Sequence, residues 1–138
     1  MVYSGTISLE TKGECDVVDI TVQVSAEIDR SGIKNGIVDI FVSGSTAGIT
    51  TIEFEPGVVQ DFKDMWERIV PRDISYAHDM AWGDGNGYSH VRASILGPSL
   101  AVPLNDGRMA LGTWQQIVLV DFDNRPRSRR LIVQVFGV

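Results

Sequence analysis

The stretch Ile117–Phe136, IVLVDFDNRPRSRRLIVQVF, decides the fold. It begins with one apolar run of strand length, Ile117–Phe122, and ends with another, Arg129–Phe136. The segment between them, Asp123–Arg127, is polar and contains Pro126, so it reads as a turn. Together with the other short strands and tight turns of the second half of the chain, this stretch indicates a largely antiparallel sheet and not a parallel βαβ fold.

Further strands are expected on both sides of this stretch. Their runs are rich in β-branched and apolar residues and are bounded by glycine, proline or polar turns. They are Val2–Leu9, Cys15–Ile20, Gly36–Val42, Val91–Leu96, Leu100–Leu104 and Arg108–Leu111. The run GIVDIFV at Gly36–Val42 is nearly all apolar, which predicts a buried central strand.

Two main helices are expected in the first half of the chain. One begins at Asp19 or Thr21 and runs to about Arg30. The other, Pro56–Val70, starts with proline at the first helical position and carries an apolar stripe that should face the core. Together, these elements predict one domain, residues 1–138, with a β-rich, mixed but mostly antiparallel, sandwich-like α+β fold.

Composition narrows the class of protein. The chain has 138 residues, 43% of them hydrophobic, which is enough for one domain with a real core. The formal net charge of −6 argues against a nucleic-acid binder, whose affinity needs a basic surface. No apolar run approaches the roughly 18 residues of a membrane span, and no signal peptide is recognised. The single cysteine, Cys15, excludes an internal disulfide and favours the cytoplasm.

The stretch Tyr76–Leu96, YAHDMAWGDGNGYSHVRASIL, holds both histidines of the chain, His78 and His90. Neutral imidazoles are good ligands for Zn²⁺ and similar ions, and Asp84 and Asp79 could complete such a site. Histidine also moves protons near neutral pH without a metal. No tight motif such as H-E-x-x-H is present, so two structural histidines satisfied by hydrogen bonds are the alternative.

A second candidate site would bind an oxyanion. Ser45, Thr46 and Gly48 lie in a small, hydroxyl-rich segment whose N–H and hydroxyl groups could contact a phosphate. Arg127 or Arg129 could add bidentate, charge-assisted hydrogen bonds. The alternatives are a plain connection between strands and a pair of solvated surface arginines.

Two further candidates are aromatic and acidic. Trp114, with Gln115 beside it, lies in a glycine-flanked turn where an indole could stack on a flat heterocycle. Glu53 lies among apolar and hydroxyl residues, where a carboxylate with a raised pKa could act as a general base. A core tryptophan and a solvated strand-end glutamate are the respective alternatives.

Six motifs then follow one another along the chain. They are STAGIT at Ser45–Thr50, EPG at Glu55–Gly57, Y-x-H at Tyr76–His78, D-G-N-x-x-S-H at Asp84–His90, LGTWQ at Leu111–Gln115 and D-x-x-P-R-x-R at Asp123–Arg129. In order and spacing they resemble the YjbQ-like family, also called secondary thiamine-phosphate synthase. The resemblance implies a compact, β-rich α+β fold and a homotrimer with sites near subunit contacts. It also implies a transferase that joins a pyrimidine pyrophosphate to a thiazole phosphate and releases pyrophosphate.

The resemblance also implies a metal site. His78 and His90 match two of the family's metal-binding histidines, while Gly44 stands where the family has a third. A three-histidine site therefore cannot form from one chain. A divalent ion, Zn or Mg, would be held by His78, His90 and Asp84, and more weakly than by three histidines.

Two functions are consistent with these residues. In a transferase, Ser45, Thr46, Arg127 and Arg129 would bind phosphate and Trp114 would support the heterocycle. In that case His78, His90 and Glu53 would have acid–base or metal roles. The alternative is a trimer that binds a small phosphorylated ligand without chemistry. Neither function involves nucleic acid or a membrane.

Overall fold

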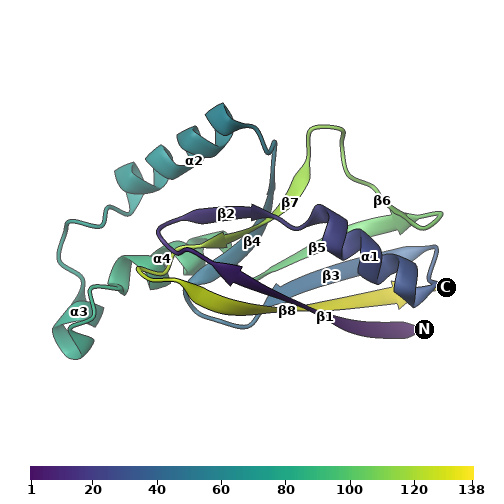
Figure 1. Ribbon diagram of the computed structural model, residues 1–138, viewed down its shortest axis with the longest axis horizontal. Helices are drawn as coiled ribbons and strands as arrows, with labels where there is room; N and C mark the ends of the chain where they lie inside the picture. The colour runs from purple at the N-terminus through teal and green to yellow at the C-terminus, as the bar shows by residue number, and fades with distance from the viewer.

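The structure, a computed structural model that describes residues 1–138, contains eight strands and four helices (Figure 1). In chain order they are β1 (Val2–Thr11), β2 (Asp16–Asp19), α1 (Thr21–Ser31), β3 (Gly36–Val42), β4 (Ala47–Ile52), α2 (Pro56–Ile69), α3 (Ala77–Trp82), α4 (Gly87–Leu96), β5 (Ser99–Asn105), β6 (Arg108–Met109), β7 (Gln116–Asp121) and β8 (Arg127–Gly137).

The strands form two sheets that pack into a sandwich. The larger sheet has the order β1-β8-β3-β5-β6 and the smaller one the order β2-β7-β4. Every strand pairing is antiparallel. The predicted β-rich, sandwich-like α+β fold is therefore confirmed, with four helices in place of the two main helices expected.

Strand β7 shows why the chain forms two apolar cores. Ile117 and Leu119 face the larger sheet and belong to the main core. Val118 and Val120 face the other way and pack with Trp66 of α2 in a second, smaller core. Because helices cover the outer face of this sheet, β7 is apolar on both faces, which explains its continuous hydrophobic run.

Strands β8 and β3 are buried on one face only. Leu131 and Val133 are fully buried, while their neighbours along β8 are more exposed. Strand β3 is central in its sheet, as predicted, because it pairs with both β8 and β5. Its outer face is uncovered, however, and Ile37 and Phe41 are 48% and 39% exposed. The prediction of a buried strand was therefore wrong for that face of β3.

The segment Val91–Leu96 is helical, so the strand predicted there was wrong. Helix α4 begins after Asn86 and buries Tyr88, Arg92 and Ala93, which are spaced as residues on one helical face. A short apolar run fits a strand or a buried helix equally well, and here helical packing against β4 decides between them.

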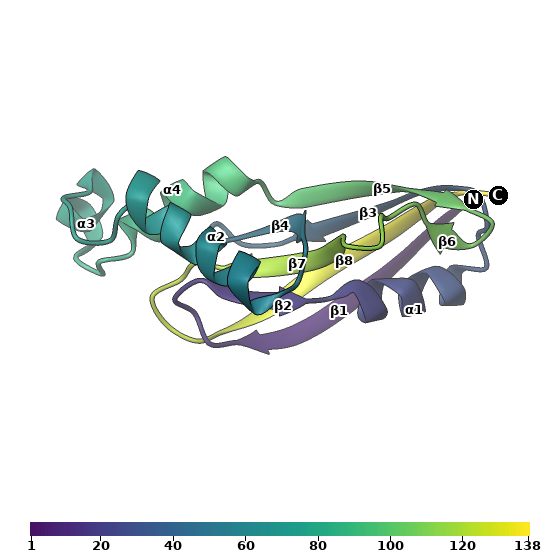
Figure 2. The ribbon, with the colours of Figure 1, turned by 90° about the horizontal axis from the view of Figure 1, so that it is seen from above.

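Helices α2, α3 and α4 gather at one end of the elongated molecule, while both termini and α1 lie toward the other end (Figure 2). Helix α2 lies over the outer face of the smaller sheet and packs against it through Trp66 (Figure 1). Of its apolar stripe, only Trp66 is fully buried, and Ile69 is 56% exposed. None of the helices has the length and apolar content needed to cross a membrane.

Candidate functional site

The two histidines lie side by side at the helical end of the molecule. His78 is in the first turn of α3 and His90 is in α4. Their ring centroids are 4.5 Å apart, with the ring planes tilted by 39°. A turn through Gly83 and Gly85, both at positive φ, reverses the chain between the helices and brings the rings together.

Two carboxylates flank His78. Its Nδ1 lies 3.4 Å from an oxygen of Asp84 and 3.6 Å from an oxygen of Asp79. Both carboxylates also hold the turn, since Asp79 accepts from the backbone N–H of Gly87 at 2.9 Å and Asp84 from that of Asn86 at 3.2 Å. His78 Nδ1 is buried and makes no hydrogen bond. A nitrogen in this state, beside two anionic oxygens, is available for another partner.

The donor set fits a divalent cation. One ligand atom each from His78, Asp79 and Asp84 lie within 4.8 Å of one another, and the ring of His90 is adjacent. Mixed imidazole and carboxylate ligands suit Zn²⁺ and similar ions, whereas Mg²⁺ prefers oxygen. The structure thus places the predicted His78, His90 and Asp84 together and adds Asp79, which sequence reasoning had offered only as an extra.

A buried network anchors the histidine turn to the sheets. Asn86 Nδ2 donates to Asp123 at 3.2 Å, and Thr46 Oγ1 and Arg127 Nε donate to the same carboxylate. Burial alone would raise the pKa of Asp123, but the hydrogen bonds from Thr46, Asn86 and Arg127 outweigh it and lower that pKa below its ordinary value. Asp123 therefore acts as a fixed anion that positions the turn.

A polar hollow of about 300 Å³ lies beside the cluster formed by His78, Asp79 and Asp84. It is lined by Asp84, Asn86, Asn124, Arg125 and Arg127. Because Asp84 also flanks His78, the hollow and the histidine pair share a wall. The side chain of Arg127, which was predicted to bind a phosphate, is partly exposed in this hollow. It can therefore contact a small molecule while its Nε remains paired with Asp123.

Arg129, by contrast, is buried inside the sandwich. Its Nε and Nη2 donate to the two oxygens of Asp121 at 2.6 and 2.8 Å, and Nη2 also donates to Thr46 at 2.6 Å. Thr46 is itself buried, and a side chain added at Gly48 would meet the carbonyl oxygen of Gly97 at 2.7 Å. These three predicted phosphate contacts therefore lie in the interior, where they hold β4, β7 and β8 together.

Ser45 remains accessible. With Gly44 and Ser94 it lines a hollow of about 200 Å³. Ser94 donates to the carbonyl of His90 at 2.8 Å, so this hollow lies one helical turn along α4 from the histidine pair.

Glu53, Trp114 and Gln115 lie elsewhere. Glu53 and Trp114 line a separate hollow of about 430 Å³ together with Phe54 and Thr113. Gln115 ties this turn to β4 through a 3.1 Å hydrogen bond to Thr51. Since Ser45 precedes β4 and Glu53 follows its six residues, the two lie roughly 20 Å apart at about 3.3 Å per residue. Within one chain, Glu53 and Trp114 do not join the histidine pair.

Sequence reasoning missed the carboxylates that organise the site. Asp121 and Asp123 are fully buried and hold Arg129 and Arg127, respectively. The sequence D-x-D at the end of one strand is followed by R-x-R at the start of the next, and these matched charges could have indicated the pairing. Asn86 was noted only as part of a motif, although it connects the histidine turn to Asp123.

Comparisons with known proteins agree on one family. A family model described as "UPF0047 protein YjbQ-like" matches residues 5–138. A UPF0047 protein of Methanothermobacter thermautotrophicus is 42% identical over 136 residues, which is 99% of this chain and 93% of that protein. One from Archaeoglobus fulgidus is 35% identical over 128 residues, 93% of this chain and 97% of that protein.

Solved structures give the same result. The crystal structure of a YbjQ-like protein of unknown function from Sulfolobus solfataricus superposes with a TM-score of 0.95 at 36% identity, over 100% of this chain and 99% of that one. An uncharacterised member of the YjbQ/UPF0047 family from Clostridium acetobutylicum has a TM-score of 0.87 at 32% identity, over 96% of this chain and 99% of that one.

Proposed function

The chain belongs to the YjbQ-like UPF0047 family, and on this premise we propose that it binds a small phosphorylated ligand beside a divalent cation. The reaction that we propose is of the thiamine-phosphate-synthase type. One observation carries the proposal: His78 and His90 adjoin each other, with the Asp84 carboxylate shared between His78 and a hollow that contains arginines.

The arrangement suits a phosphate group. Arg125 and Arg127 supply positive charge to the hollow, and Asn86 and Asn124 line it with amide groups. Asp84 would face a cation on one side and this hollow on the other. A phosphorylated ligand in the hollow would then lie next to the cation, which is the usual arrangement in sites that release pyrophosphate.

The proposed reaction balances without a redox partner. The bond between the pyrimidine methylene carbon and the pyrophosphate oxygen breaks, and the leaving pyrophosphate takes the electron pair. The thiazole nitrogen supplies the pair for the new C–N bond and becomes a cation. Arg127 and Arg125 would stabilise the charge on the leaving group as it develops. A divalent cation, when bound, would add neutralising charge.

A second candidate is a trimer that binds the ligand without chemistry. Two observations favour it: Gly44 replaces the family's third histidine, and Glu53 and Trp114 lie apart from the histidine pair.

The homotrimer is also part of our proposal, and the exposed apolar residues Ile37 and Phe41 on the larger sheet support an interface between copies. Sedimentation equilibrium of the purified chain measures the oligomeric state directly.

The test is to measure thiamine phosphate formed by the purified chain from both substrates with added Zn²⁺ or Mg²⁺. We expect turnover by the wild type that is lost in His78→Ala and reduced in Arg127→Ala. Arg108→Ala, an exposed change near the hairpin turn at the other end of the molecule, is the matched control and should not alter it. Ligand binding without any product would favour the non-catalytic candidate, and unchanged turnover in His78→Ala would contradict the assigned site.

A further inference from the structure

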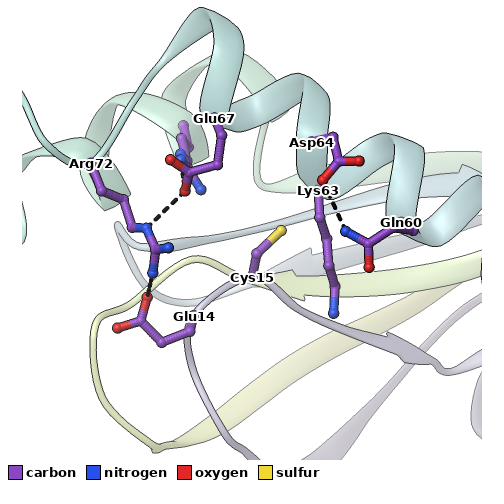
Figure 3. A pocket seen from close by; sticks show the side chains of 8 residues that line it. Glu14, Cys15, Gln60, Lys63, Asp64, Glu67 and Arg72 are labelled. Carbon is purple, nitrogen blue, oxygen red and sulfur yellow. Dashed lines mark hydrogen bonds and ion pairs between the residues drawn. The ribbon is translucent and has the colours of Figure 1, made fainter.

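A polar cavity, open to solvent, lies beneath helix α2, away from the histidine site. It has a volume of about 220 Å³ and lies between α2 and the turn that joins β1 to β2 (Figure 3). Its lining residues are Glu14, Cys15, Gln60, Lys63, Asp64, Glu67, Arg72 and Arg92. None of them belongs to the histidine cluster or to the hollow that contains Arg127.

Each carboxylate of the cavity already has a donor. Glu14 accepts from Arg72 at 2.8 Å, and Glu67 pairs with Arg72 at 2.7 Å and with Arg92 at 3.0 Å. Asp64 accepts from the Gln60 amide at 2.9 Å. Figure 3 shows Arg72 reaching from Glu67 to Glu14 and so closing one side of the cavity. The acidic groups therefore do not call for a cation.

The basic groups, by contrast, have donors to spare. The side chain of Arg92 is only 2% exposed, and its Nε and Nη2 are used by the Val70 carbonyl and Glu67. Its Nη1 has no hydrogen-bond partner in the chain. Lys63, which extends from α2 toward the turn in Figure 3, forms no ion pair. Nη1 is not one of the fully buried side-chain atoms that lack a partner, so it reaches the accessible space of the cavity and can donate to a ligand there.

Cys15 adds a neutral wall to the cavity. Burial raises the pKa of its thiol to about 11, so at neutral pH it is protonated and brings no negative charge. Its side chain points toward α2 in Figure 3. The group facing Lys63 across the cavity is thus a weak hydrogen-bond donor and does not compete as an anion.

From this balance of satisfied acceptors and unsatisfied donors, we infer that the cavity under α2 binds a small oxyanion, a phosphate or carboxylate group, between Lys63 and Arg92. Such a ligand would connect α2 to α4, because Lys63 belongs to the first helix and Arg92 to the second. Helix α2 otherwise buries only Trp66 completely. Binding would therefore fasten this helix to the body of the protein. The inference stands apart from the proposed function and does not require it.

The experiment titrates ¹⁵N-labelled full-length protein with inorganic phosphate and, separately, with acetate, and follows backbone amide shifts. We expect saturable shifts at Glu14, Cys15 and Lys63. The variant Lys63→Gln should weaken this binding by about tenfold or more, as the loss of a charge-assisted bond does. Arg68→Gln removes the same charge from an exposed position of α2 outside the cavity and should leave the affinity unchanged.

The outcomes separate this cavity from the histidine site. Shifts that persist in His78→Ala and disappear in Lys63→Gln support the inference, and the anion that binds more tightly identifies the group as phosphate or carboxylate. Shifts confined to Asp84, Asn86 and Asn124 would place the anion in the other hollow and overturn it. Absence of saturable shifts at Glu14 and Cys15 with both anions, or equal weakening by Arg68→Gln, would also overturn it.

Discussion

Two charged clusters lie at the helical end of this protein, and they differ in how completely they are satisfied. In the first, Arg129 forms two short hydrogen bonds to Asp121 and a third to Thr46, all in the interior. In the second, His78 lies between Asp79 and Asp84 without a hydrogen bond from its Nδ1. Both contain the residue types that sequence reasoning assigned to a site.

The difference between the clusters indicates their roles. A saturated, buried ion pair has no capacity for a ligand, and removal of one partner leaves an unpaired charge in the interior. An unsaturated cluster at the surface contributes little to stability and keeps its ligand atoms available. We therefore expect changes in the Arg129 cluster to act on folding and changes in the His78 cluster to act on binding.

The largest effect is expected from Arg129→Leu. This change leaves Asp121 fully buried with only Thr11 as a side-chain donor, and should lower the free energy of unfolding by about 3–5 kcal/mol. Urea denaturation measures it. Arg130→Leu, an exposed neighbour on β8, is the control and should change stability by less than about 0.5 kcal/mol. If the free energy of unfolding falls by a similar amount in both variants, the buried Arg129–Asp121 pair does not contribute more to stability than an exposed arginine does.

Gly44→Ala should produce a smaller loss. The added methyl group would lie 2.6 Å from Nη1 of Arg129, whose guanidinium cannot move freely because Asp121 and Thr46 hold it. We expect a cost of about 1–3 kcal/mol from this overpacking, measured by thermal or urea unfolding. Gly112→Ala is the control, because its methyl group would find its nearest neighbour at an ordinary 3.6 Å. Equal stability of the two variants would mean that the Arg129 side chain can move away from the added methyl group at little cost.

Acid should weaken the same interior network. The pKa of Asp123 is lowered in the folded state, so its ionised form contributes stability that is complete above the unfolded-state pKa and is lost as pH falls through the folded-state value. Unfolding free energy measured from pH 7 downward should therefore drop below about pH 4. Asp123→Asn should flatten that part of the profile, whereas Asp61→Asn, an exposed change on α2, should not.

His78→Ala should have the smallest effect on stability. His78 is 30% exposed and its Nδ1 makes no hydrogen bond, so we expect a change within about 0.5 kcal/mol in urea unfolding. A loss comparable to that of Arg129→Leu would mean that the histidine cluster is part of the folded framework, and the contrast between the two clusters would disappear.

Much of the fold could be predicted from the sequence because its turns are explicit. Asp106 and Gly107, both at positive φ, form the turn of the hairpin between β5 and β6, and the sequence Asn105-Asp106-Gly107 is typical of such turns. Helix α4 was missed because the run after His90 is short and apolar, and periodicity alone does not distinguish a buried strand from a helix.

The candidate site was predictable only in part. His78 and His90 were proposed to share one site, and the structure brings their ring centroids to 4.5 Å. The role of Arg129 could not be predicted from the sequence, since an arginine near a turn can bind either a phosphate or an aspartate. Strands β7 and β8 belong to different sheets, and only the packing of the two sheets against each other brings Asp121 to Arg129. The separation of Glu53 from the histidines likewise depends on the direction of β4 in the sandwich.

The most direct test of the central claim is calorimetric titration of untagged, metal-free protein with Zn²⁺. The unsatisfied cluster of His78, Asp79 and Asp84 predicts one ion per chain, with affinity reduced by about tenfold or more in both His78→Ala and Asp84→Asn while both variants stay folded. Equal affinity and stoichiometry in the wild type and His78→Ala would contradict the assignment.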